Sequence, residues 1–149
     1  MDLDETDLII LNELQGDFTT SYRDIAKKLN MSVGTVHNRV KKLKETGVIK
    51  SFTAIIDAEK LGYELTAIIL MQVEGGKIVD VEQAIARSKS VTAVYDTTGE
   101  FDIIAVAKFK TREDLNSFIK ETLKIGAVKR TVTSMVLNVV KEDVRLNLK

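Results

Sequence analysis

The chain has 149 residues, 44% of them hydrophobic, and its 22 basic and 22 acidic residues cancel to a net charge of zero. This length allows one domain or two small ones with real hydrophobic cores, and the neutral charge argues against a general nucleic-acid coat. The absence of cysteine excludes disulfides and thiolate sites, and a single histidine leaves little for a metal cluster or a Ser-His-Asp triad, so we expect no metal, no cofactor and no enzyme.

The first residues and the hydropathy of the chain indicate where in the cell the protein is expected. The acidic first residues do not form a signal peptide, and no apolar run approaches the roughly 18 to 20 residues of a membrane span. We therefore expect a cytoplasmic protein with no membrane partner.

Two helices are predicted at the start of the chain. Residues 4–16 place leucine and isoleucine side chains at helical spacing, and Asp2 or Asp4 caps a first turn rich in acids, which suits the positive end of a helix. Residues 21–29 form a second, short helix that Ser21 opens with a capping box.

Residues 32–47 form the third and most informative predicted helix. Ser32 caps its first turn, and Gly47 ends it in a left-handed turn. One side is an apolar stripe and the opposite side is small, polar or basic, namely Val33, Val36, Val40 and Leu43 against Gly34, Thr35, Asn38, Lys41 and Lys42. A short helix, a tight turn and such a longer helix make a helix-turn-helix, whose second helix enters the major groove.

The charge distribution favours this interpretation. Residues 20–50 carry a net charge of +6, whereas residues 1–19 carry −6. Positive charge concentrated around one candidate recognition helix is typical of a protein that binds phosphate backbones, so we expect double-stranded DNA as a partner. The alternative is an ordinary helical hairpin whose charges form a solvated face.

The second half has a different pattern. Residues 51–57 are rich in strand-forming residues and are predicted to be an extended connector. Strand, helix, strand then follows twice, with strands at 65–73, 91–97, 101–109 and 127–140 and helices at 79–88 and 111–123. This is a ferredoxin-like βαββαβ sheet with both helices on one side, so the fold class is α+β. The expected domains are a helix-turn-helix domain at 1–50, a connector at 51–63 and a βαββαβ domain at 64–149.

The strands of this sheet do not alternate between apolar and polar residues. Residues 68–71 and 103–107 are continuous apolar runs, which indicates that both faces of the sheet are covered. Nothing is left in the chain to cover the second face except another copy. The sequence therefore predicts a homodimer through the sheet.

Five motifs occur along the chain in a specific order. They are Leu3–Asp7, Ile25–Leu29, Ser32–Val36 followed by Arg39 and Val40, Leu43–Ile49, and Thr98–Asp102 followed by an apolar strand. In this order they resemble the Lrp/AsnC (feast/famine) transcriptional regulators of bacteria and archaea over essentially the whole chain, and the proline-free composition looks archaeal. The resemblance implies a winged or simple helix-turn-helix joined to an amino-acid-sensing domain (RAM, ACT-like), with dimers assembling into tetramers, octamers or hexadecamers. Twofold dimers would read a pseudo-palindromic site.

DNA contacts are predicted to come mainly from the third helix. We assign Gly34, Thr35 and Asn38 to the groove, because a missing side chain permits close approach and Asn can pair bidentately with adenine. Arg39 reads guanine or holds a phosphate, and His37 beside it is a neutral polar contact rather than a pH switch. The remaining candidates, most of them phosphate contacts, are Ser21, Tyr22, Arg23, Ser32, Lys41, Lys42 and Lys44.

The loop at 97–102 is the predicted effector site. Backbone N–H groups around Gly99 can hold a carboxylate and Asp102 can hold an ammonium, a pair that suits an amino acid. By the resemblance, this loop lines a site between dimers. The full predicted set is Tyr95, Thr97, Thr98, Gly99, Glu100, Asp102, Thr131, Thr133 and Ser134. The alternative is a hairpin turn whose Gly and Asp only satisfy backbone geometry.

Two other functions compete with a regulator. Siroheme decarboxylases resemble the same family, but the only histidine here, His37, lies on the predicted recognition helix. A nucleoid protein that packs DNA without choosing sites would be more broadly basic.

Overall fold

The computed structural model describes residues 3–16 and 19–148 of the chain. Their contacts divide the chain into two compact units, Met1–Ile55 with Lys141–Lys149, and Ile56–Val140. The sequence assigned residues 141–149 to the second domain, whereas the contacts of residues 141–148 group them with the first unit. Among the described residues, no helix has the length and apolar character needed to cross a membrane.

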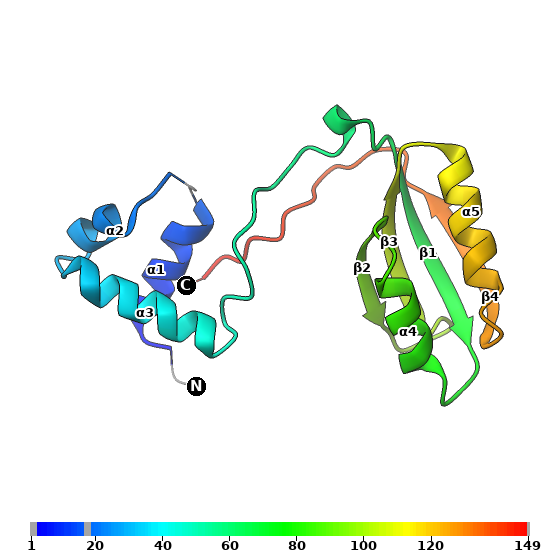
Figure 1. Cartoon of the computed structure of the whole chain (residues 1–149), viewed down its shortest axis with the longest axis horizontal. Helices are drawn as coiled ribbons and strands as arrows, with labels where there is room; N and C mark the ends of the chain where they lie inside the picture. Colours follow the sequence, from blue (N-terminus) through cyan, green and yellow to red (C-terminus); the bar gives the residue numbers. More distant parts are fainter. Residues whose placement is uncertain (1–2, 17–18, 149) are drawn as a thin grey trace. The chain divides into compact units, whose positions relative to one another are not determined.

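The first unit is built from three helices, α1 (Glu5–Gly16), α2 (Tyr22–Lys28) and α3 (Val33–Glu45) (Figure 1). Their shared core contains Ile10, Ile25, Ala26, Val36, Val40 and Leu43, each at most 2% exposed. Since α2 and α3 are short or strongly amphipathic, this packing rather than intrinsic propensity stabilises them.

Side-chain caps begin both helices of the helix-turn-helix as predicted. Ser21 and Asp24 form a complete capping box at the start of α2. Ser32 Oγ accepts a hydrogen bond from the N–H of Thr35 at 3.0 Å at the start of α3. Asn30, with φ of 51°, makes the turn between these two helices, a conformation that Asn tolerates better than most residues. The predicted capping by Asp2 lies outside the described residues.

The chain leaves α3 through Gly47, whose φ of 75° is left-handed. Residues 50–57 then form an extended segment that pairs with no strand in the described chain, and Phe52, Ile55 and Ile56 are 54–64% exposed. Within the described residues of the first unit no strand follows α3, so the wing of a winged helix-turn-helix is not formed there.

The second unit is a four-stranded antiparallel sheet with two helices. After a short 3-10 turn, η1 (Glu59–Leu61), its elements are β1 (Leu65–Val73), α4 (Ile78–Ala86), β2 (Val91–Asp96), β3 (Ile103–Phe109), α5 (Arg112–Leu123) and β4 (Val128–Met135). The strand order is β2-β3-β1-β4, the ferredoxin-like order. The predicted α+β fold is therefore confirmed.

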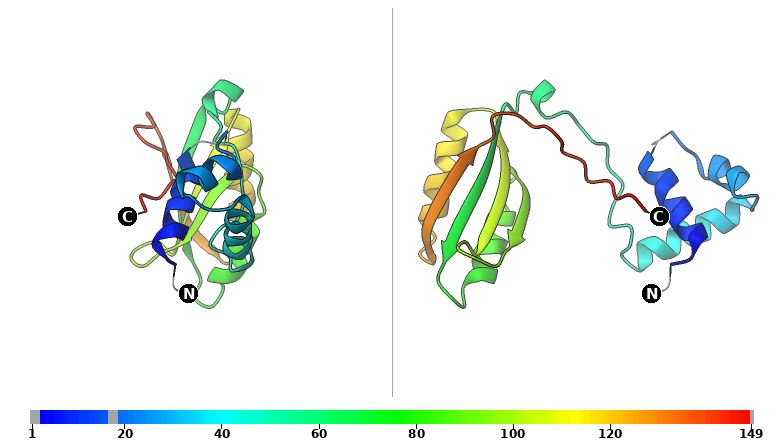
Figure 2. Two further views of the ribbon diagram at one scale, coloured as in Figure 1. Left: turned by 90° about the vertical axis from the view of Figure 1, so that its left-hand side faces the viewer. Right: turned by 180° about the vertical axis from the view of Figure 1, so that it is seen from behind.

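Both helices cover one face of this sheet (Figure 1), and in the view from behind the other face carries no helix of the described chain (Figure 2). Ala67, Ile69 and Met71 point into the helix-covered core and are at most 1% exposed, whereas Ile68 is 37% exposed. We call this second side the open face. It carries the apolar residues Ile68, Leu70, Ile104, Val106 and Val132, which lie opposite one another across the strands.

The last strand is shorter than the sequence predicted. We expected it to run to Val140, but β4 ends at Met135, which lies opposite Ala67 near the start of β1. After one more bond, from the N–H of Val136 to the carbonyl of Thr66, the chain has no neighbouring strand to pair with. Leu137 is 99% exposed, so strand-forming side chains alone do not extend the sheet.

Candidate nucleic-acid interface and effector loop

The two sides of α3 differ in the structure as the sequence predicted, with one exception. Val36, Val40 and Leu43 are at most 1% exposed and pack against α1 and α2, whereas Val33, which the sequence placed on the same apolar stripe, lies in the first turn and is 44% exposed. Gly34, Thr35, Asn38, Lys41 and Lys42 are exposed, and a Cβ added at Gly34 would meet only Ser32 Oγ, at 3.7 Å. This exposed side therefore offers small and polar groups near the start of α3 and ammonium groups further along it.

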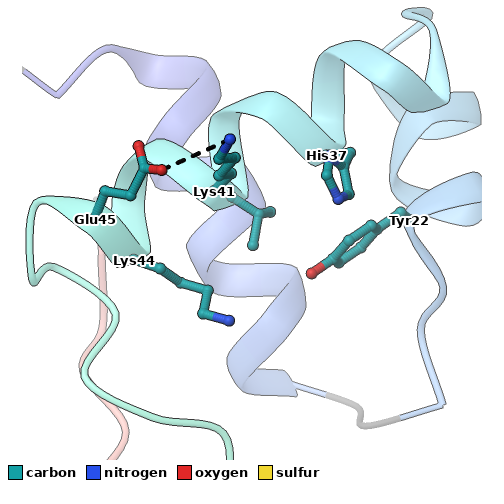
Figure 3. Close-up of a pocket in the computed structure, with 6 residues that line it drawn as sticks. Tyr22, His37, Lys41, Lys44 and Glu45 are labelled. Carbon is teal, nitrogen blue, oxygen red and sulfur yellow. Dashed lines mark ion pairs between the residues drawn. The ribbon is translucent and has the colours of Figure 1, made fainter.

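A pocket of about 320 Å³ lies beside the exposed side of α3, between α3 and the start of α2 (Figure 3). The Tyr22 ring meets the His37 ring edge-on, with centroids 6.1 Å apart. Lys41 Nζ lies 3.8 Å from a Glu45 carboxylate oxygen, and Lys44 Nζ lies 5.8 Å from the centre of the Phe52 ring. The pocket is lined by Tyr22, His37, Val40, Lys41, Lys44 and Glu45. It brings together four of the predicted DNA-binding residues, which come from two helices.

Arg39 lies on the flank of α3 that faces α1. Its Nη1 is 2.7 Å from a carboxylate oxygen of Asp7 and 2.7 Å from one of Asp4, and its side chain is 30% exposed. These hydrogen bonds raise the pKa of Arg39 above its usual value. The N–H of Asp7 and the guanidinium of Arg39 lower the pKa of Asp4. Arg39 thus joins α3 to the acidic first turn of α1.

Hydrogen bonds hold the predicted effector loop, both within the loop and to β1. Asp102 Oδ2 accepts a hydrogen bond from the N–H of Val73 at 2.8 Å, and the N–H of Asp102 donates to the carbonyl of Met71. Thr97 Oγ1 donates to the carbonyl of Phe101, and its N–H to the carbonyl of Asp102. Gly99 has φ of 123°, which favours glycine. Because Asp102 is held in this turn, β3 begins at Ile103 rather than at Phe101.

The other predicted effector residues do not lie on one surface. Thr131 and Thr133 lie opposite Met71 and Ile69 and so point to the helix-covered side. Ser134, opposite Ile68, and Tyr95, opposite Ile104, lie on the open face. Glu100 pairs with Arg130 at 3.5 Å, and its carbonyl accepts from Gln72, while Thr98 is an exposed bend residue. One chain therefore does not gather the nine residues into a single site.

Comparison with known proteins identifies the chain. Residues 66–146 match the model of the Lrp/AsnC ligand binding domain, and residues 3–50 match a winged helix-turn-helix DNA-binding model. The chain belongs to the Lrp/AsnC family of transcriptional regulators. It is 54% identical over 146 residues to an HTH-type transcriptional regulator of Pyrococcus furiosus, with 98% of this chain and 99% of that protein covered. It is 41% identical to the regulator FL11 of Pyrococcus horikoshii, with 99% and 97% covered.

Solved structures of this family share the fold. Escherichia coli AsnC matches with a TM-score of 0.85 and 26% identity, covering 97% of this chain and 99% of AsnC. The L-Met complex of the regulator NMB0573 from Neisseria meningitidis matches with a TM-score of 0.85 and 25% identity, covering 99% and 97%. The family and these relatives are transcriptional regulators rather than enzymes.

Sequence reasoning missed two parts of the first unit. It did not anticipate that Asp4 and Asp7 reach Arg39, although the acidic start of the chain and the basic third helix were both visible as opposite charges. It also missed the return of residues 146–148 to α1, where Gln15 and Asn12 hold the backbone. The alternation of Val144, Leu146 and Leu148 was the available signal of an extended segment, although the side chains of Val144 and Leu146 stay 80% and 70% exposed.

Proposed function

We propose that this regulator binds pseudo-palindromic DNA sites as a dimer-based oligomer, with α3 as its recognition helix and a small amino acid as its modulator. The observation that carries the proposal is the division of α3 into one side that buries Val36, Val40 and Leu43 and an exposed side of Gly34, Thr35, Asn38 and lysines. A helix with these two sides can be held rigidly by its unit while it presents polar groups to the major groove.

Within this interface the residues take different roles. Gly34 permits close approach to the groove, Thr35 and Asn38 read base edges, and Asn38 is the candidate for a bidentate contact with adenine. Lys41, Lys42 and Lys44 meet phosphates, which position the protein without specifying sequence. Arg39 contributes by holding α3 against α1, because its guanidinium is already engaged by two carboxylates.

The pocket beside α3 extends the phosphate contacts to α2. Tyr22 and His37 offer a hydroxyl and a ring N–H next to the ammonium groups of Lys41 and Lys44. Ser21 and Arg23 lie next to Tyr22 at the start of α2, and we assign them to phosphates of the same DNA strand. Ser32 caps α3 and acts by fixing its first turn.

A second copy of the chain is proposed to cover the open face. Ile68, Leu70, Ile104, Val106 and Val132 form a contiguous apolar surface there, and such surfaces mark interfaces. A twofold pair gives two recognition helices and therefore a site with two half-sites. Association of such dimers into tetramers, octamers or hexadecamers remains part of the proposal.

For the effector, the support comes from the loop at 97–102 and from one neighbour. The solved structure from Neisseria meningitidis is a complex with L-Met. One carboxylate oxygen of Asp102 accepts the N–H of Val73, and the other oxygen can accept a hydrogen bond from an ammonium group. Because Thr131, Thr133, Ser134 and Tyr95 lie on two faces, we propose that residues of two subunits complete the site.

Selection of bound duplexes from random DNA, with and without each amino acid, tests the proposal directly. The expected result is a pseudo-palindromic motif whose enrichment changes with at least one amino acid. Recovery of random sequence at 100 to 150 mM salt would reject sequence-specific binding. Enrichment that no amino acid alters would reject the effector while leaving the DNA function standing.

A further inference from the structure

The outer side of α1 binds the C-terminal segment of the chain. Gln15 contacts the backbone of Leu146 at both polar groups, since its Oε1 accepts from the N–H at 2.9 Å and its Nε2 donates to the carbonyl at 3.2 Å. Asn12 Nδ2 donates to the carbonyl of Leu148 at 2.8 Å. The red segment that precedes the C-terminus runs beside α1 (Figures 1 and 2). The segment is therefore held through its backbone by two side chains of α1.

This contact lies on the side of α1 that faces away from the helix-turn-helix. Asn12 and Gln15 are three residues apart and share a face with Leu8. Ile10, on the other side, is 0% exposed in the core with α2 and α3, and the first turn of α1 reaches Arg39 through Asp7. The helix α1 thus connects the C-terminal segment to the recognition helix.

Residues just before the docked part are also locally ordered. Arg145 makes a two-pronged ion pair with Asp143, at 2.9 and 3.0 Å, and this pair lowers the pKa of Asp143 to about 2. The backbone N–H of Arg145 donates to the same carboxylate. This arrangement favours one local conformation of the chain immediately ahead of Leu146.

The chain passes between the two units twice, once after Ile55 and once before Lys141. We propose that docking of residues 146–148 on the Asn12 and Gln15 face of α1 is a second tether of the DNA-binding unit, and that this tether restricts which half-site spacings the dimer accepts. A DNA-binding unit held by one flexible connection samples a wide range of positions, whereas two connections narrow that range. For half-sites at the matching spacing, the second unit of the dimer is then at a higher effective concentration near its half-site. The inference on spacing rests on the proposed DNA function, but the docking itself does not.

Hydrogen exchange of the Leu146 amide, measured by NMR on the full chain without DNA, tests the docking. Gln15→Ala removes both bonds to Leu146 and is expected to speed its exchange by on the order of ten-fold. Gln83→Ala, a change of an exposed glutamine on α4, is the matched control and should leave the rate unchanged. Exchange of Leu146 that is as fast in the wild type as in Gln15→Ala would overturn the docking.

A pair of proline variants tests the tether. Leu146→Pro removes the N–H that donates to Gln15, whereas Asn147→Pro changes the next, exposed residue, for whose N–H no such bond is formed in the described chain. Affinity is measured for duplexes with two half-sites at varied spacing. We expect Leu146→Pro to reduce the preference of the wild type for its best spacing by about five-fold and Asn147→Pro to retain it.

These outcomes separate the two proposals. An unchanged spacing preference in Leu146→Pro would overturn the tether. If the wild type binds no duplex, the proposed DNA function fails, and the exchange experiment still decides whether the segment docks.

Discussion

Nη1 of Arg39 lies 2.7 Å from Oδ1 of Asp7, across 32 residues of sequence, and joins α3 to α1. The same nitrogen is 2.7 Å from Asp4. An arginine on a basic helix is ordinarily assigned to phosphate, but here the acidic start of the chain neutralises it. We therefore propose that Arg39 positions α3 rather than contacting DNA.

Arg39→Ala is expected to weaken DNA binding without changing its salt dependence. Loss of a direct phosphate contact lowers the slope of log K against log salt by about 1, whereas loss of helix position lowers affinity at every salt concentration. We also expect the thermal midpoint to fall by a few degrees, because a partly exposed ion pair is lost. Binding titrations from 50 to 300 mM salt check this, and a slope reduced by about 1 would instead assign Arg39 to DNA.

Acid is expected to destabilise the first unit partly through Asp4. Its pKa in the folded chain is below the ordinary value of 3.8, because it accepts the N–H of Asp7 and pairs with Arg39. The stability it contributes is present above pH 3.8 and is lost as the pH falls through the lowered pKa. When thermal unfolding is measured between pH 5 and 2, the midpoint temperature of Asp4→Asn should therefore fall less steeply with decreasing pH than that of the wild type. Glu5→Gln, in the same turn, is the control, and equal slopes in all three proteins would contradict the assignment.

Local chemistry could be predicted from the sequence, and long-range contacts could not. The caps Ser21 and Ser32 and the stripe of Val36, Val40 and Leu43 depend on neighbours within a few residues, so spacing alone places them. The end of β4 depends on where β1 begins, and the docking of Leu146 depends on Gln15, more than a hundred residues away. The same limit applies to Asp102, whose carboxylate is committed to Val73 by the sheet register.

Asp102→Asn separates the two roles of the effector loop. An amide oxygen can still accept the N–H of Val73, so the fold should be retained, whereas the charge that would hold an ammonium is removed. We expect calorimetric titration with the twenty amino acids to show binding to the wild type and loss of that binding in Asp102→Asn. Asp102→Ala should in addition lose about 1 to 2 kcal/mol of stability, because a partly buried N–H is left unpaired. If no amino acid gives a heat of binding to the wild type, the loop at 97–102 is a structural turn and the effector site is rejected.

Ile68→Glu is expected to separate the subunits. Ile68 lies at the centre of the open face, where a carboxylate would be buried unpaired in a dimer but solvated in a monomer. Sedimentation at micromolar concentration should then give the 16.6 kDa chain for the variant and a larger species for the wild type. Ala84→Glu places the same charge on an exposed position of α4 and should not change the mass. A wild type that sediments as a folded monomer would refute the interface.

Asn38 and Lys42 are both exposed on α3 and are predicted to act differently on DNA. Asn38→Ala removes a side chain that can pair with a base edge, so affinity for the selected site should fall by about ten-fold while binding to random duplex is retained. Lys42→Ala removes a phosphate contact, so both affinities should fall together and the salt slope should drop by about 1. The ratio of specific to random binding therefore distinguishes them, since only Asn38→Ala should lower it. If Asn38→Ala weakened binding to both duplexes equally, base reading would have to come from another part of α3.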